Sequence, residues 1–245
     1  MAAREAKRDK EGWLIEYDGH PVERISRLLE QTTVHIKNKA GTKLQVTEPK
    51  WVINIKGTNG SGKSTVPIHM LHAETEWCYL TVSRDDKKPV ATYAKTYDVV
   101  ILGAYLSGTN CGGCDYLSDT QEVKRILRAL WRKDVHIIFE GIIVGDIKST
   151  FYNMMNAFNT IHKRHISFCF MGTRYAECLK RIQRRNGGKE IKEDLVKSKY
   201  KNAVTHLKYY LEQGDVDVQV LKTDCTRQES FERFLSIYPA LQPLF

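Results

Sequence analysis

The stretch Gly57-Thr58-Asn59-Gly60-Ser61-Gly62-Lys63-Ser64 decides the fold. It fits the pattern G-x-x-x-x-G-K-[ST], which is typical of a phosphate-binding P-loop. An apolar run at 51–55 precedes it as a buried-strand candidate, and a helix-like stretch at 63–72 follows it. This strand, loop and helix context favours a phosphate site over a Gly/Ser loop with a chance lysine.

Each residue type in this loop has a chemical role at a phosphate. Glycines let backbone N–H groups turn inward onto an anion, and the helix that follows presents its positive end to the same group. Lys63 is expected to reach the β- and γ-phosphates of ATP, and Ser64 to hold Mg²⁺. The residues predicted to bind the nucleotide are Gly57, Asn59, Gly60, Ser61, Gly62, Lys63, Ser64 and Thr65. Pro67 is expected to kink the helix or to make it start tightly.

The bulk composition bounds the class of protein. A chain of 245 residues, 42% hydrophobic and 27% charged, indicates one soluble globular domain with elaborations, or at most two small ones. No apolar run approaches the roughly 18 residues that span a bilayer, and the charged start is not a secretory signal, so no membrane partner is expected. Six scattered cysteines favour reduced thiols in a cytoplasm, and a single C-x-x-C lacks further zinc ligands. The net charge of +9 is compatible with a kinase of small anions and with a nucleic-acid binder.

Residues 1–50 are predicted to form an N-terminal extension. A strand at 13–17, a helix at 21–31 and a hairpin within 32–46 are indicated by turn signals and apolar spacing. The extension is either a packing addition at the edge of the sheet or a substrate-binding addition, since its turn is basic.

Strands alternate with helices after residue 50, which predicts an α/β fold with a parallel sheet wrapped on both faces. The expected strands are 51–55, 77–82, 135–139, 165–171 and 216–221, with a hairpin or two further strands at 90–94 and 98–104. The expected helices follow capping signals at 118–121 and 226–229, and also cover 147–161, 173–185 and 191–212.

Two further groups are expected at the carboxyl ends of the strands, where such sheets bind ligands. Glu140 ends a buried apolar strand, and a carboxylate there can hold Mg²⁺ or accept the proton of an attacking hydroxyl. The alternative is an ordinary acid at a strand end. Arg181 and Arg185, with two more arginines at 174 and 184, lie along one helix, and guanidinium groups suit the charge of a transferring phosphoryl group. The alternative for each arginine is a solvated helix face.

The segment 168–185 resembles the part of nucleoside monophosphate kinases that leads into their mobile lid. Together with the P-loop and Phe139-Glu140-Gly141, it is similar to the P-loop kinase superfamily over about residues 50–240. The resemblance implies a mostly parallel five-stranded sheet in the order 2-3-1-4-5, a kinase domain at 51–245, a substrate loop at about 84–118 and a lid at about 184–192. The acceptor motifs of adenylate and thymidylate kinases are absent, which argues against a standard free nucleotide as substrate.

The stretches 102–105, 111–115 and 120–123, followed by 139–141, resemble bacteriophage 5-hydroxymethyluracil DNA kinases. The resemblance implies ATP-dependent phosphorylation of the hydroxymethyl group of 5-hydroxymethyluracil in DNA, a step in thymidine hypermodification, in the cytoplasm of an infected bacterium. It places Asp115 in the substrate loop as a candidate general base, the alternative being a turn acid. The expected catalytic residues are Lys63, Asp115, Glu140, Arg181 and Arg185, with Ser64 and Glu140 at the metal.

A DNA substrate carries a physical requirement, because a base stacked in a duplex cannot reach the γ-phosphate and must be flipped out. Backbone contacts from lysines and arginines would offset that cost, and the lysine-rich helix at 192–208 is consistent with such contacts. Two alternatives stay open: a kinase of a free nucleoside or nucleoside monophosphate, and a non-enzymatic nucleotide- or DNA-binding module.

Overall fold

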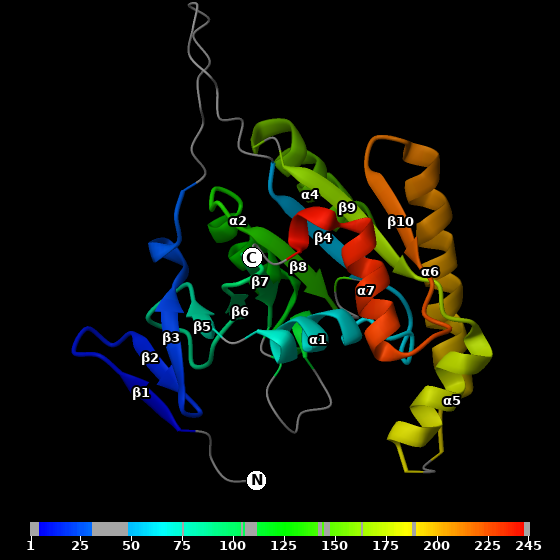
Figure 1. The fold of residues 1–245 in the computed structure, drawn as a ribbon, viewed down its shortest axis with the longest axis horizontal. Coiled ribbons are helices and arrows are strands. Elements are labelled where there is room, and N and C mark those ends of the chain that lie inside the picture. Colours follow the sequence, from blue (N-terminus) through cyan, green and yellow to red (C-terminus); the bar gives the residue numbers. More distant parts are fainter. Residues whose placement is uncertain are drawn as a thin grey trace, which may run out of the picture.

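A ten-stranded mixed sheet forms the centre of the molecule in the computed structural model, which describes residues 5–30, 49–74, 76–103, 105, 112–141, 144, 148–162, 164–187 and 190–242. The spatial order is β1-β2-β3-β5-β6-β7-β8-β4-β9-β10 (Figure 1). The strands are β1 (Ala6–Arg8), β2 (Leu14–Tyr17), β3 (His20–Arg24), β4 (Trp51–Lys56), β5 (Trp77–Thr81), β6 (Ala91–Ala94), β7 (Val99–Leu102), β8 (His136–Glu140), β9 (His165–Met171) and β10 (Asp217–Leu221). The prediction of a five-stranded, mostly parallel sheet in the order 2-3-1-4-5 is therefore wrong for the sheet as a whole, in both the number and the order of its strands.

Within this sheet, β7, β8, β4, β9 and β10 are adjacent and parallel. The sheet is larger than expected because the hairpin predicted at 90–104 becomes β6 and β7 inside it, with β6 antiparallel to both neighbours. Beyond β5, three strands of the N-terminal extension continue the sheet.

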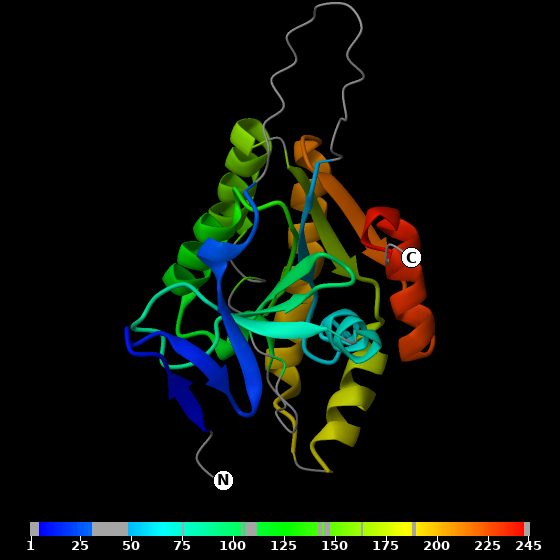
Figure 2. The same cartoon turned by 60° about the vertical axis from the view of Figure 1, so that its left-hand side comes forward.

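Helices cover both faces of the sheet, as expected. They are α1 (Thr65–Ala73), α2 (Thr120–Leu130), α4 (Lys148–His162), α5 (Tyr175–Arg185), α6 (Glu193–Gln213) and α7 (Arg227–Ile237), with short 3-10 turns η1 (Ile25–Arg27), η2 (Gly113–Tyr116) and η3 (Pro239–Leu241). One core packs α2, α4 and α6 against the sheet, and the other packs α1 and α7 against the opposite face (Figure 2). Successive side chains of β4 point to opposite faces of the sheet, so this strand contributes to both cores. Val52 lies in the first core, and Ile53 and Ile55 lie in the second.

The N-terminal extension differs from its prediction. The expected strand at 13–17 is confirmed as β2, but the expected helix at 21–31 is wrong. Its first residues form β3, which pairs in parallel with β5, and η1 follows. Val22 and Ile25 are buried in these conformations, so their helix-like spacing is satisfied by a strand and a tight turn. The hairpin predicted within 32–46 lies outside the described residues.

Two helix starts are also corrected. The first helix begins at Thr65, so Pro67 lies in the first turn, where a backbone N–H has no partner within the helix. At α2 the cap is Asp119, whose side chain accepts hydrogen bonds from the backbone N–H groups of Gln121 and Glu122. The capping box at Thr226 and Glu229 is confirmed. No helix in the described part of the chain is long and apolar enough to cross a membrane, and the five described cysteines are free thiols.

Candidate active site

The P-loop runs from the end of β4 to the first turn of α1, as its sequence predicts. Gly60 adopts a φ of 74°, a left-handed conformation that favours glycine. A Cβ atom on Gly60 would lie 2.5 Å from the backbone oxygen of Cys178. The loop therefore packs directly against α5, and a side chain at this position would push the two apart.

Lys63 lies buried beneath the loop, with its Nζ atom 3.0 Å from the backbone oxygen of Thr58, to which it donates a hydrogen bond. Burial lowers the pKa of Lys63, while the charges of Glu140 and Asp115 raise it in part. The two predicted catalytic acids and the P-loop lysine thus share one electrostatic environment. A lysine in this setting can supply a compact positive charge to a phosphate.

Glu140 occupies the last position of β8 and is buried. Its Oε1 atom accepts a hydrogen bond from the Ser64 hydroxyl at 2.9 Å and another from the Tyr105 hydroxyl at 2.8 Å. Burial raises the pKa of Glu140, and Lys63 and these two donors oppose that rise. The two residues predicted at the metal are therefore adjacent, and their oxygen atoms are of the kind that Mg²⁺ prefers.

Tyr105 was not predicted as a site residue. It follows β7, and its ring packs over a pair of glycines, since a Cβ atom on Gly112 would lie 2.5 Å from the ring. A Cβ atom on Gly113 would lie 2.9 Å from the Tyr105 hydroxyl and 2.7 Å from Oε1 of Glu140. The two glycines of the C-x-x-C stretch therefore make room for the contact between Tyr105 and Glu140. Tyr105 ends one of the stretches that carry the family resemblance, 102–105, but nothing in the sequence pairs it with Glu140.

Asp115 lies in η2, half-buried, close to the turn that follows β8. A Cβ atom on Gly141 would lie 3.0 Å from Oδ1 of Asp115. The structure thus brings the two predicted acids, Glu140 and Asp115, to the same edge of the sheet from different segments of the chain. One carboxylate is buried and bonded to the P-loop serine, and the other is more accessible.

The predicted arginines are placed differently from one another. Arg181 lies beside the P-loop, with Nη1 3.5 Å from a Cβ position on Gly62. Its guanidinium donates to Glu177 at 2.9 Å and to the backbone oxygen of Thr223 at 2.7 Å, which fixes its direction. Arg185 is exposed in the last turn of α5, and within the described part of the chain it makes no hydrogen bond or ion pair with the P-loop.

A pair of threonines, also unpredicted, holds the P-loop backbone. The Thr173 hydroxyl donates to the backbone oxygen of Ser61 at 2.6 Å, and the Thr223 hydroxyl reaches the same oxygen at 3.5 Å. The two hydroxyl groups also contact each other. Thr173 follows β9 and Thr223 follows β10, so two strand ends converge on one carbonyl group of the loop. Strand-end threonines are common, and the sequence gives no sign that these two meet.

Comparison with known proteins connects this site with a family. The sequence profile of the 5-hmdU DNA kinase family matches residues 36–224. The chain is 30% identical over 225 residues to a 5-hmdU DNA kinase of Bacillus phage SP10, covering 89% of this chain and 34% of the relative. It is 35% identical over 155 residues to a 5-hmdU DNA kinase of Pseudomonas phage M6, covering 61% of this chain and 79% of the relative. The chain thus spans about a third of the SP10 relative and most of the M6 relative.

Among solved structures, a deoxyadenosine kinase from M. mycoides with bound dATP matches 77% of this chain and 99% of its own, with 13% identity and a TM-score of 0.38. That likeness is too low to support a conclusion about this chain. The family profile, which covers more than half of the sequence, does support one. The narrower resemblance predicted from residues 102–141 is confirmed: this chain belongs to the 5-hmdU DNA kinase family.

Proposed function

We propose that this protein transfers the γ-phosphoryl group of ATP to the 5-hydroxymethyl group of 5-hydroxymethyluracil in DNA, as a step in thymidine hypermodification. Membership of the family carries the proposal, and the geometry is in keeping with it. The P-loop, Glu140 and Asp115 lie together at the carboxyl edge of parallel strands, where such sheets bind ligands.

In this proposal the P-loop binds ATP. Its backbone N–H groups and Lys63 would hold the phosphates, and Arg181, already directed by Glu177, would offset the charge that spreads over the transferring group. Ser64 and Glu140 would hold Mg²⁺, and the bound ion would neutralise charge on the phosphate oxygens. Arg185, at the end of α5 where the predicted lid at about 184–192 begins, would join this set when ATP is bound.

We assign the acceptor side of the reaction to Asp115 in η2, within the segment at about 84–118 that is expected to be a substrate loop and that also contains β6 and β7. The hydroxymethyl oxygen would give its proton to the Asp115 carboxylate and form a bond to the γ-phosphorus, while the bond from that phosphorus to the bridging oxygen of ADP breaks. Glu140 is the less suitable base, because it is buried and its Oε1 atom already accepts two hydrogen bonds. The target nucleotide must leave the base stack to reach this position.

A kinase of a free nucleoside or nucleoside monophosphate is the competing function. The deciding experiment offers labelled ATP together with duplex DNA that contains 5-hydroxymethyluracil, with the same DNA containing thymine, and with the free nucleoside and monophosphate. We expect label in the modified DNA alone, and its dependence on Mg²⁺ can be measured with a chelator. Label only in the free acceptors would overturn the proposal. A Lys63→Met variant serves as the inactive control. We place the reaction in the cytoplasm of an infected bacterium, since the relatives are phage proteins.

A further inference from the structure

The loop at 82–90 opens at the same edge of the sheet as the candidate active site. Strand β5, which precedes this loop, is antiparallel to β6, and β6 is antiparallel to β7. Consequently β5 points in the same direction as β7, and β7 is parallel to β8 and, through it, to β4. The carboxyl ends of β5, β8 and β4 therefore lie along one edge, which carries this loop, Glu140 and the P-loop in turn.

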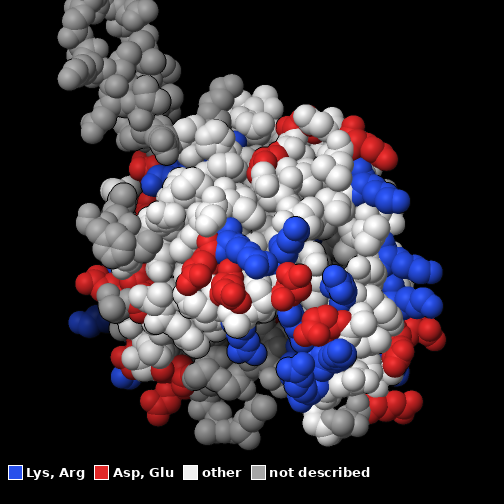
Figure 3. Space-filling view, turned by 45° about the vertical axis from the view of Figure 1, so that its right-hand side comes forward, with Lys and Arg blue, Asp and Glu red and all other residues white. Residues whose placement is uncertain are grey.

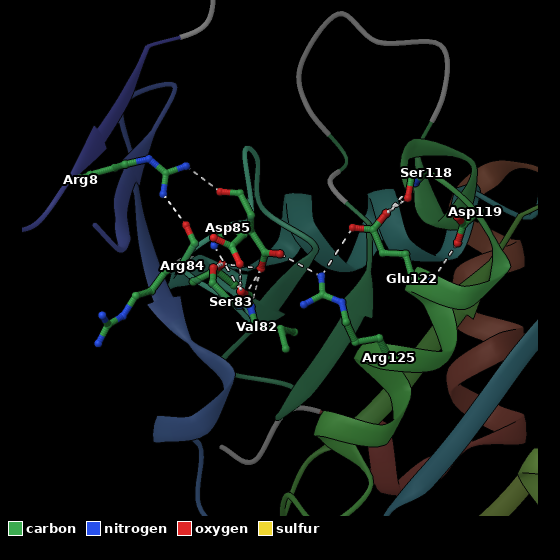
Figure 4. Close-up of polar contacts among 11 residues, drawn as sticks. Arg8, Val82, Ser83, Arg84, Asp85, Ser118, Asp119, Glu122 and Arg125 are labelled. Carbon is green, nitrogen blue, oxygen red and sulfur yellow. Dashed lines mark hydrogen bonds and ion pairs between the residues drawn. The ribbon is translucent and has the colours of Figure 1, made fainter. Parts of the chain in front are cut away.

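The N-terminal strands hold this loop in place. Arg8 in β1 donates from Nη1 to the backbone oxygen of Arg84 at 2.8 Å and from Nη2 to that of Asp86 at 2.7 Å. The buried carboxylate of Asp86 in turn accepts a hydrogen bond from Arg125 of α2 at 2.8 Å. It also accepts from the hydroxyl of Thr81 and from the backbone N–H groups of Val82 and Ser83. Figure 4 shows this network between β1 on one side and α2 on the other.

The same loop contacts the segment that carries the candidate base. Lys88 donates a hydrogen bond to the backbone oxygen of Tyr116, and its Nζ atom lies 3.8 Å from the centre of the Tyr116 ring. Tyr116 is the neighbour of Asp115 in η2. If one base of a DNA strand reaches Asp115, the neighbouring part of that strand therefore lies next to this loop.

Two basic side chains on the loop face solvent. Arg84 has 60% of its side chain exposed and directs its guanidinium away from the Asp86 network (Figure 4). That guanidinium lies 5.8 Å from the Trp13 ring, and its Nη2 atom lies 3.9 Å from Oε2 of the exposed Glu11; both contacts are long and therefore weak. Lys87 is exposed beside it. A fixed loop backbone with outward cations provides phosphate contacts at a small cost in ordering entropy.

We propose that Arg84 and Lys87 bind the phosphate backbone of the DNA strand next to the modified base, and that β1, β2 and β3 serve to hold this loop in position. The proposal rests on the proposed function, and it names the surface on which that substrate lies. It also gives the N-terminal extension a role in substrate binding, the second of the two roles that the sequence left open.

The lysine-rich helix α6 is the competing surface. The backbone oxygen of Val196, near the start of α6, accepts a hydrogen bond from Thr58 of the P-loop, so that end lies at the site. Lys208 is twelve residues further on, which places it about 18 Å along the helix from that contact. The face of the molecule drawn in Figure 3 carries basic and acidic side chains that are intermixed. The start of α6 lies beside the P-loop, where the charge of Lys199 acts on Lys63.

The test compares two double variants, Arg84→Gln/Lys87→Gln and Lys201→Gln/Lys208→Gln, each of which removes two exposed cations. Fluorescence anisotropy would measure the affinity of each for duplex DNA containing 5-hydroxymethyluracil over a series of salt concentrations. We expect the slope of log affinity against log salt to become shallower by about 2 for the loop variant, about 1 for each lost phosphate contact. We expect the α6 variant to keep the slope of the parent protein.

Equal slopes for the parent and the loop variant, or a loss confined to the α6 variant, would overturn the proposal. Thermal unfolding of both variants confirms that each is folded. The readout is binding, so it is separate from the transfer of label that tests the proposed function. If the salt slope of the parent protein depends on the loop while label enters only free acceptors, that pair of results would overturn the proposed function and still support the DNA-binding surface.

Discussion

The hydroxyl oxygen of Ser64 lies 2.9 Å from Oε1 of Glu140, and this contact joins the P-loop to the end of the neighbouring strand β8. Strands β4 and β8 are parallel neighbours, so their carboxyl ends are adjacent and residues far apart in the sequence meet there. The pair has one hydroxyl and one carboxylate, with the buried Lys63 as the nearby positive charge. We therefore expect the proposed phosphate transfer to depend on Glu140.

The first prediction concerns the charge of Glu140. Glu140→Gln keeps the shape and the contacts with Ser64 and Tyr105 but removes the negative charge that would hold Mg²⁺. We expect the rate of phosphate transfer to fall by about 10²-fold or more, since electrostatic and acid–base groups in active sites contribute on that scale. Steady-state kinetics measure the effect, with Glu232→Gln on the surface of α7 as the control. A fall of less than tenfold would remove Glu140 from the machinery.

The second prediction concerns the pH dependence that Tyr105 imposes. Burial raises the pKa of Glu140. The hydrogen bond that the Tyr105 hydroxyl donates to Glu140 lowers this pKa and so opposes the effect of burial. Tyr105→Phe removes the donor, so the pKa of Glu140 should rise. Activity that needs ionised Glu140 should then be lost at a higher pH on the acidic side. The pH profile of kcat measures this shift, and an unchanged acidic limb would contradict it.

The third prediction concerns Asp115. If Asp115 is the general base, Asp115→Asn should lower kcat for DNA by about 10² to 10⁴-fold while ATP binding stays near that of the parent protein. Rapid-quench measurement of the chemical step and isothermal titration with a nonhydrolysable ATP analogue separate the two. Turnover within a few-fold of the parent would show that the proton is taken by another group.

The parts of the site that lie within a continuous motif were predictable. The P-loop carries its own signature, and Glu140 follows an apolar run that is typical of a buried parallel strand. Tyr105, Thr173 and Thr223 gave no such signal, because their role depends on contacts across the sheet. Tyr105 meets Glu140 only through two glycines that let the segments approach closely. The threonines meet only because β9 and β10 are adjacent and parallel.

The N-terminal strands show a different limit of sequence reasoning. The sequence spacing of the apolar residues at 22 and 25 is compatible with a helix and also with a strand that ends in a tight turn. Pairing with β5 decides between them, since β3 gains a ladder of backbone hydrogen bonds and buries Val22 against Tyr79 in a small core of its own. Tertiary pairing of this kind overrides local periodicity.

The fourth prediction concerns the threonine pair. The Thr223 hydroxyl and that of Thr173 both reach the backbone oxygen of Ser61, and so orient the loop whose N–H groups would hold the phosphates. Thr223→Val keeps the shape and removes the hydroxyl, at a cost of about 1 kcal/mol, typical of one hydrogen bond. We expect KM for ATP to rise about fivefold with little change in kcat. Thr223→Ser should restore the parent value, and failure to do so would assign the effect to packing.

His136 gives the fold a pH dependence that is independent of the active site. The residue is buried in β8, and its Nδ1 atom accepts a hydrogen bond from the backbone N–H of Trp51 at 3.0 Å. Burial, together with the positive charges of Lys50 and Arg164, lowers the pKa of His136 from its ordinary value of 6.5 to about 3. The folded protein thus holds this imidazole neutral at a pH where the unfolded chain would protonate it.

The fifth prediction follows from that difference. Because the folded pKa lies below the unfolded one, the stabilisation is complete above pH 6.5 and is lost as the pH falls from there towards about 3. The free energy of unfolding should therefore drop by up to about 1.4 kcal/mol per pH unit from this group alone. His136→Gln, which keeps an acceptor for Trp51, should flatten the curve by that amount, whereas His72→Gln on the exposed end of α1 should not. Urea unfolding at pH 7.5, 5.5 and 4.5 measures the slopes. Parallel curves for the parent and His136→Gln would mean that the folded protein accommodates the charged imidazole.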